Sequence, residues 1–385
     1  MLAMRLSKVL LTGAAAISAA TLLAVLLTGD LAGYGIGVTA LTATLLLLVT
    51  GLGAVVSTYA ARNLEGQRRL GRFAGLEVMV VGGLALVVLG ANLVVIALAW
   101  TIAGVAMAGL VGHAGTPAAR AASRLVASRV LAGDLALWLA VAVAWFGLGT
   151  VDVAGLTEPA AGAPILAGLF AVLVVSAGAV RSSLSPWHGW LPETAEAPSP
   201  VSALLHAGFV NGLGILALVL WPLIGGSTPA RVLALVLGLA TVVVATAQHR
   251  VRPDVKGRLA SSTSSQMGYM GMQVGIGLPV GVLVHLIGHG MWKASLFLGA
   301  GGAVERVRSA SAAVVVRGRG PAVAGAALAL GVVLTAATLP LPGTESLLHA
   351  PATTLVVLVA ALAAGAAVVG LLRHYQGPVV APVAL

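Results

Sequence analysis

The feature that most restricts how this chain can fold is a recurring apolar run about as long as a membrane crossing. A hydrocarbon core about 30 Å thick takes roughly 20 apolar residues per helical span. Only 8% of the 385 residues are charged, against roughly 25% in a soluble domain, so a water-facing surface cannot be covered. We predict an all-α, polytopic membrane protein of twelve spans: 9–27, 34–57, 74–91, 92–112, 130–148, 163–181, 201–224, 231–249, 259–278, 279–300, 321–339 and 350–372.

The basic residues sit in short loops between these runs. If the N-terminus is cytoplasmic, all but two of the 21 lysines and arginines fall on the cytoplasmic side, the exceptions being Arg231 and Lys293. The positive-inside rule therefore predicts cytoplasmic N- and C-termini, and it explains the net charge of +10 without a nucleic-acid partner. The first 29 residues resemble a signal peptide, but a second apolar run follows closely, so we expect an uncleaved first span.

The sequence offers little that favours catalysis. It has no cysteine, which excludes disulfides, iron–sulfur clusters and thiolate metal sites on this chain. No catalytic triad, metal-ligand cluster, phosphate loop or dinucleotide fingerprint stands out. We therefore expect no catalytic, cofactor-binding or metal-binding residues here, and assign any catalysis to a partner.

Three ionisable residues follow one face of the tenth span. His285, His289 and Lys293 are spaced i, i+4, i+8, so they share a helix face. Charged groups at bilayer depth are costly and mark ion pathways, and histidine titrates near neutral pH. We predict an ion-conducting row. The alternative is that Lys293 extends to the interface with its charge in water.

A second polar region lies around the seventh span. The stretch 187–200 holds three prolines and two tryptophans, which predicts irregular backbone near a membrane interface. His206 and Asn211 follow it inside the span. These side chains are either functional or hydrogen-bonded packing groups, and the stretch is either a covered segment or an ordinary interfacial loop with an aromatic anchor.

Three motifs carry a family resemblance. They are WHGWLPETAEAPSPVSALLHAG (187–208), DVKGRLASSTSSQMGYM (254–270) and HLIGHGMWKASLFLGAGG (285–302). Their order and spacing resemble the antiporter-like, proton-conducting subunits of complex I, Mrp antiporters and membrane hydrogenases. The resemblance covers roughly residues 74–372.

The resemblance implies two inverted five-helix repeats with broken helices at the sixth and eleventh spans. It divides the chain into two N-terminal helices and a basic loop (1–73), a conducting domain (74–372, with repeats at about 74–224 and 231–372) and a tail (373–385). The implied ion-conducting residues are Lys293, His289, His285, Lys256, His206 and Arg181. Those of the broken-helix region are Trp190, Pro192, Pro200, Asn211 and Trp100.

The chain departs from this pattern in three places. The family's pumping members place a glutamate after the tryptophan of the fourth span, but Thr101 follows Trp100 here. Arg181 replaces the family's lysine, and arginine does not release its proton near neutral pH. The lysine expected late on the second broken helix is missing too. We therefore expect no switching Lys–Glu pair, and a pumping role would need a carboxylate from a neighbouring subunit.

One branch fits these departures better. ALAWTIAGVAMAGLVGHAG, ASRVLAGDLALWLA and LLHAGFVNGLGI resemble the DabB (MpsA) subunits of bacterial inorganic-carbon transporters. That resemblance implies a bacterial inner or plasma membrane location, conduction of protons or Na⁺, and a large soluble zinc-containing DabA-like partner. The zinc would belong to the partner, with no cofactor on this chain. A subunit of an NADH-quinone oxidoreductase, hydrogenase or Mrp complex and a non-conducting membrane anchor remain as alternatives.

Overall fold

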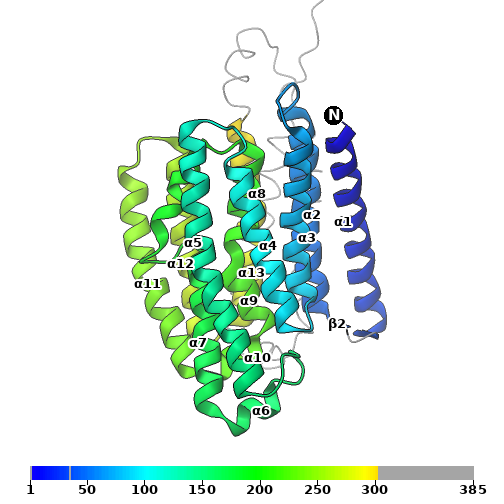
Figure 1. The fold of residues 1–385 in the computed structure, drawn as a ribbon, viewed down its shortest axis with the longest axis vertical. Helices are drawn as coiled ribbons and strands as arrows, with labels where there is room; N and C mark the ends of the chain where they lie inside the picture. Colours follow the sequence, from blue (N-terminus) through cyan, green and yellow to red (C-terminus); the bar gives the residue numbers. More distant parts are fainter. Residues whose placement is uncertain (1, 34–35, 302–385) are drawn as a thin grey trace, which may run out of the picture.

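The computed structural model describes residues 2–33 and 36–301, which form a bundle of helices running in alternate directions (Figure 1). The long helices are α1 (Leu2–Thr28), α2 (Ala40–Asn63), α3 (Leu70–Leu89), α4 (Leu93–Val111), α5 (Pro117–Ala142), α7 (Pro164–Arg181), α11 (Thr228–Val251), α12 (Val255–Ile276) and α13 (Pro279–Gly301). Shorter helices are α6 (Thr157–Gly162), α8 (Ser199–Ala207), α9 (Gly212–Val219) and α10 (Trp221–Gly226). Strands β1 (Leu31–Gly33) and β2 (Ile36–Val38) pair antiparallel between α1 and α2.

The predicted fold class is confirmed in the described part. Ten of the twelve predicted spans fall there, and each coincides with helical backbone. Nine helical segments of the described residues are apolar and long enough to cross a membrane: the long helices other than α12, and Ser199–Val219, which runs from α8 to α9. The helix α12 is not among them, because polar residues such as those of SSTSSQ interrupt its apolar sequence. The last two predicted spans, the second broken helix and the tail lie outside the described residues.

Two boundaries differ from the sequence prediction. The second span begins at Ala40 rather than 34, because the β pair occupies residues 31–38. The fifth begins at Pro117 rather than 130, and a π-helical turn (Val143–Gly147) extends it. Thr116 caps this helix, its Oγ1 accepting from the Ala119 amide at 3.0 Å, and Pro117 suits a first turn. The arginines of this segment are therefore helical, not in a loop.

The connection between α7 and α8 is irregular, as predicted. It contains two short 3₁₀ helices, His188–Trp190 and Pro192–Glu196. Trp190 is 1% exposed, and its indole N–H donates to the carbonyl of Val180 at 3.2 Å. The interpretation of an interfacial aromatic anchor is therefore wrong for Trp190. Pro192 and Pro200 are also buried, each in the first turn of a helix.

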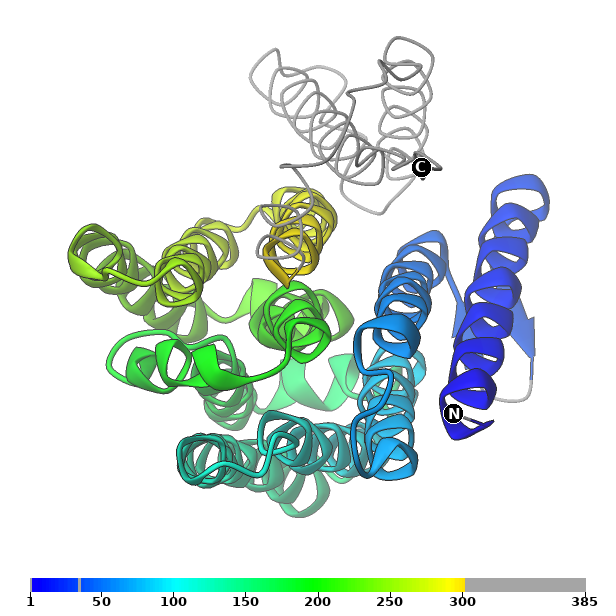
Figure 2. The same ribbon diagram turned by 90° about the horizontal axis from the view of Figure 1, so that it is seen from above.

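The predicted seventh span is itself interrupted. It consists of α8, a 3₁₀ turn at Phe209–Asn211 and α9, rather than one continuous helix over 201–224. Every residue of its membrane-crossing window is buried. Figure 2 shows this green helix in the middle of the described bundle, with the yellow α13 beside it. The α8–α9 helix is thus the element around which the candidate site is arranged.

Candidate functional site

The histidine–lysine row of α13 faces a matching polar row on α12. Lys293 Nζ donates to Ser262 Oγ at 3.0 Å and to the Leu259 carbonyl at 3.2 Å. His289 Nδ1 lies 3.0 Å from Gln266 Oε1, and His285 Nδ1 lies 3.0 Å from Gln273 Oε1. Because α12 and α13 are antiparallel neighbours, these pairs follow one another along the bundle as a ladder.

Lys293 is buried, so it does not extend to the interface. It is 1% exposed, which contradicts the alternative in which its ammonium group reaches water. Among residues 2–33 and 36–301, no carboxylate lies within ion-pair distance of it. A buried ammonium group held only by neutral oxygens lacks the counter-charge that normally accompanies burial. This uncompensated cation is the most unusual group of the row.

His289 sits between two oxygen atoms. Its Nδ1 faces Gln266 Oε1 and its Nε2 lies 2.9 Å from the His206 carbonyl oxygen. Two carbonyl oxygens can both be satisfied only by an imidazole that carries two protons, whereas rotating the Gln266 amide satisfies a neutral ring. The ring and the amide therefore form a unit that accommodates either protonation state with both ring nitrogens bonded.

His206 and Lys256 join this row from two other elements. The His206 ring, on α8, stacks on Phe297 of α13 with centroids 4.2 Å apart, and its Nδ1 has no hydrogen-bond partner among the described residues. Lys256, in the first turn of α12, donates to the Ala197 carbonyl at 2.7 Å. That bond ties the start of α12 to the irregular connection before α8. The structure thus brings five predicted residues, Lys256, His206, His285, His289 and Lys293, into one contiguous region.

Arg181 lies in a separate cluster, and the sequence analysis was wrong about its surroundings. Its Nη2 donates to Asp134 Oδ1 at 2.8 Å and to the Trp100 carbonyl at 2.9 Å. Its guanidinium carbon lies 3.6 Å from the centroid of the Trp100 ring and 4.7 Å from that of Phe209. Both Arg181 and Asp134 are nearly inaccessible to solvent. The carboxylate sought beside Thr101 is present, but it comes from α5.

Two glycines allow this close approach. A Cβ at Gly104 on α4 would lie 2.9 Å from Arg181 Nη2, and one at Gly212 on α9 would lie 2.7 Å from the Trp100 ring. Real Cβ atoms do not come so near a neighbour. The backbone of two helices can therefore surround the guanidinium only where side chains are absent.

The two regions meet at the interruption of α8–α9. The Phe209 ring packs against the Arg181 guanidinium. One turn earlier, the His206 carbonyl oxygen lies within hydrogen-bond distance of His289 Nε2. Asn211 lies between α8 and α9 and donates to the Ala207 carbonyl at 2.7 Å. Among the described residues no side-chain hydrogen bond links Arg181 to His206. The interrupted helix, rather than a continuous hydrogen-bond chain, connects the two regions.

Sequence reasoning missed Asp134, Ser262, Gln266 and Gln273. The last three could have been recognised from the many polar residues of α12, which are unusual in a chain of apolar spans. Sequence reasoning also missed Glu77, a fully buried carboxylate of α3 that accepts a hydrogen bond from Ser7 Oγ at 2.8 Å. A lone acidic residue inside an apolar run was the available signal for Asp134 and Glu77.

Most of the sequence matches a known family of membrane proteins. Residues 90–375 match the family described as NADH:quinone oxidoreductase/Mrp antiporter, TM. The chain is 32% identical to the probable inorganic carbon transporter subunit DabB1 of Halothiobacillus neapolitanus over 271 residues, 68% of this chain and 48% of that protein. It is 30% identical to NADH-quinone oxidoreductase subunit L of Mycobacterium tuberculosis over 281 residues, 71% of this chain and 44% of that protein. The chain thus spans about half the length of these relatives.

Solved structures show the same fold. The Mrp complex from Dietzia sp. superposes with a TM-score of 0.70 at 25% identity, covering 96% of this chain and 47% of the other. The archaeal membrane-bound sulfane sulfur reductase gives a TM-score of 0.71 at 16% identity, covering 97% and 82%. With the family match extending over most of the sequence, the chain belongs to the NADH:quinone oxidoreductase/Mrp antiporter transmembrane family.

Proposed function

We propose that this chain is the proton- or Na⁺-conducting membrane subunit of a two-component inorganic-carbon uptake system. In this role it would energise a soluble, zinc-containing, carbonic-anhydrase-like DabA-type partner. The observation that carries the conducting role is the buried row of Lys293, His289 and His285, hydrogen-bonded to α12. The similarity to two DabB subunits of Halothiobacillus neapolitanus, 32% and 31% identical, supports the carbon-uptake assignment.

In this proposal Arg181 is a fixed charge and Asp134 is the group that exchanges a proton. Arginine stays charged near neutral pH, so a switch at this pair requires the carboxylate to change. Protonating Asp134 would leave Arg181 uncompensated in a buried site. The field of that charge would then oppose a cation in the row of His206, His289 and Lys293. The pair and the row would thereby be coupled without a continuous hydrogen-bond chain.

The test begins with the partner. The chain, tagged in its native host and gently solubilised, should copurify with one large zinc-containing soluble protein. Deleting the chain should then abolish accumulation of labelled bicarbonate, and Lys293→Ala should do the same with normal membrane insertion. Lys8→Ala, which removes the same charge from an exposed position, should leave accumulation unchanged. Normal bicarbonate accumulation in the deletion strain would refute the assignment.

A second candidate is an antiporter-like subunit of an NADH-quinone oxidoreductase, hydrogenase or Mrp complex. Asp134 favours it, because the chain itself supplies the carboxylate that a switching pair requires. The similarity to subunit L and to the Mrp complex agrees with it. Here the purification would yield several quinone-reductase, hydrogenase or antiporter subunits, and deletion would reduce NADH-linked pumping or sodium tolerance.

A further inference from the structure

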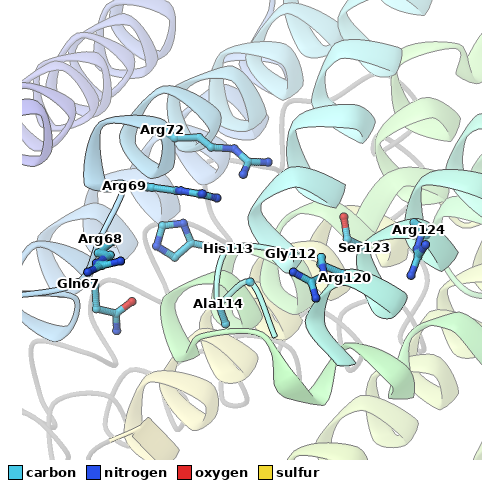
Figure 3. Close-up of a pocket in the computed structure, with 11 residues that line it drawn as sticks. Gln67, Arg68, Arg69, Arg72, Gly112, His113, Ala114, Arg120, Ser123 and Arg124 are labelled. Carbon is cyan, nitrogen blue, oxygen red and sulfur yellow. The ribbon is translucent and has the colours of Figure 1, made fainter. Parts of the chain in front are cut away.

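A strongly basic pocket lies at the end of the bundle where the chain begins, away from the conducting row. It is formed by the α2–α3 connection, the end of α4 and the start of α5, and it encloses about 760 Å³. Figure 3 shows Arg69 and Arg72 extending from the start of α3 toward the α4–α5 connection, with Arg120 and Arg124 on α5. The basic side chains of its lining are Arg68, Arg69, Arg72, His113, Arg120 and Arg124.

Within residues 2–33 and 36–301, no carboxylate neutralises the positive charge of this pocket. No aspartate or glutamate of that part of the chain lines it. None of its five arginines forms an ion pair with a carboxylate in the described residues, where the two ion pairs are Arg181–Asp134 and Arg252–Glu193. The pKa of His113 is lowered by burial and by the charges of Arg72 and Arg69. The pocket therefore has the electrostatics of an anion site, and guanidinium groups suit phosphate oxygens geometrically.

The walls of the pocket continue as exposed apolar helix faces. On α3, Arg72, Met79 and Leu86 follow one another at intervals of seven residues, and both apolar side chains are exposed. On α5, Leu131 and Leu135 lie below Arg124 on the same face and are exposed as well. Residues seven or eleven positions apart share a helix face. A ligand with its charge among the arginines can thus lay hydrocarbon chains along α3 and α5.

We propose that this pocket binds the phosphate group of an anionic phospholipid, in the leaflet on the side where the chain begins. Basic pockets between membrane helices attract anionic headgroups in this way. A soluble acidic segment would match the arginines but would leave the apolar faces beneath them unused. This inference does not depend on the proposed function, because none of these residues belongs to the conducting row.

The test measures lipid affinity of the detergent-solubilised full chain by native mass spectrometry. The probes are phosphatidylglycerol and phosphatidylcholine with identical acyl chains, and inorganic phosphate. The pocket variant combines Arg72→Gln, Arg120→Gln and Arg124→Gln. The control variant, Lys8→Gln with Arg5→Gln and Arg62→Gln, removes three exposed charges from the same end of the bundle outside the pocket lining.

The wild-type chain should prefer phosphatidylglycerol, and the pocket variant should bind it more weakly by roughly fivefold per arginine removed. The control variant should keep the preference. Equal affinity of the wild type for both lipids, or equal losses in the two variants, would overturn the proposal. Inorganic phosphate that displaces the lipid at equal concentration would assign the pocket to a free anion. If the triple variant does not fold, Arg120→Gln alone, at an exposed position, should still show the loss.

A photoreactive probe separates lipid from protein occupants. The chain has no cysteine, so Ala114→Cys, at an exposed and uncharged position of the pocket lining, carries a single label and keeps all five arginines. In native membranes the label should attach to phospholipid. Attachment to an acidic protein segment instead would show that the pocket is a protein docking site and would contradict the proposal.

Discussion

Arg181 and Lys293 are both buried cations in the centre of the bundle, yet their surroundings differ. Arg181 has a carboxylate partner, two aromatic rings and a backbone carbonyl. Lys293 has one hydroxyl and one carbonyl, with histidines farther along its helix and no ion-pair partner in the described residues. Arg181 therefore has a counter-charge beside it, whereas Lys293 has only neutral oxygen partners among the described residues. In our proposal the guanidinium keeps its charge, and the ammonium group of Lys293 is the one that can release a proton.

Removing the carboxylate should cause the largest loss of stability. Asp134→Ala leaves Arg181 buried without a counter-charge, at a cost of about 3–5 kcal/mol in the free energy of unfolding. Combining Asp134→Leu with Arg181→Met should recover most of it, since apolar replacements of a buried pair are often neutral. Thermal unfolding in detergent measures both.

The exposed ion pair Arg252–Glu193 provides the control for that change. Its side chains are 37% and 54% exposed, so Glu193→Ala should cost at most about 1 kcal/mol. Equal effects of Asp134→Ala and Glu193→Ala would show that the buried Arg181 does not depend on its carboxylate partner.

A smaller effect is expected from crowding the arginine. Gly104→Ala places a methyl group against Val130 Cγ1 and 2.9 Å from Arg181 Nη2, and it should cost about 1–3 kcal/mol through overpacking of both neighbours. Gly82→Ala on α3 meets no atom within 4 Å and should be neutral or slightly stabilising. Comparing the two unfolding temperatures separates local crowding from a general effect of replacing glycine.

The row itself should respond to loss of an amide. Gln266→Leu removes the partner of His289 Nδ1 and should cost about 1–2 kcal/mol, while ion flux falls because the ring loses its exchangeable contact. The control is Thr246→Ala, which removes an exposed hydroxyl contact with Ser265 between α11 and α12. Flux unchanged in Gln266→Leu would remove the ring–amide unit from the mechanism.

The smallest effect concerns pH at the connection before α8. Burial lowers the pKa of His188, which contacts Gln248 through Nε2 at 3.0 Å. A histidine with a lowered folded-state pKa binds protons less readily when folded, so it costs stability as pH falls through the unfolded value of about 6.5. Unfolding measured from pH 8 to pH 5 should therefore show a loss that His188→Gln reduces. An identical profile in that variant would assign the loss to other groups.

The positions of the helical spans in the described residues were predictable because the length of an apolar run reports on the thickness of the bilayer. The row on α13 was predictable too, since i, i+4, i+8 spacing fixes a helix face. Asp134 was not recognised, because a carboxylate was sought directly after Trp100 on α4, whereas the packing of α5 against α4 and α7 supplies it from another helix. The interruption at Phe209–Asn211 was missed because no proline marks it.

The central claim is that the ion passes along the row of His285, His289 and Lys293, in which the Lys293 ammonium group has no counter-charge among the described residues. Its most direct test is flux through the purified complex in liposomes, driven by an imposed gradient and measured for protons and Na⁺ separately. Lys293→Ala should lower flux at least about tenfold with normal assembly, and Lys8→Ala should match the wild type. Wild-type flux in Lys293→Ala would contradict the claim and leave the row with a structural role.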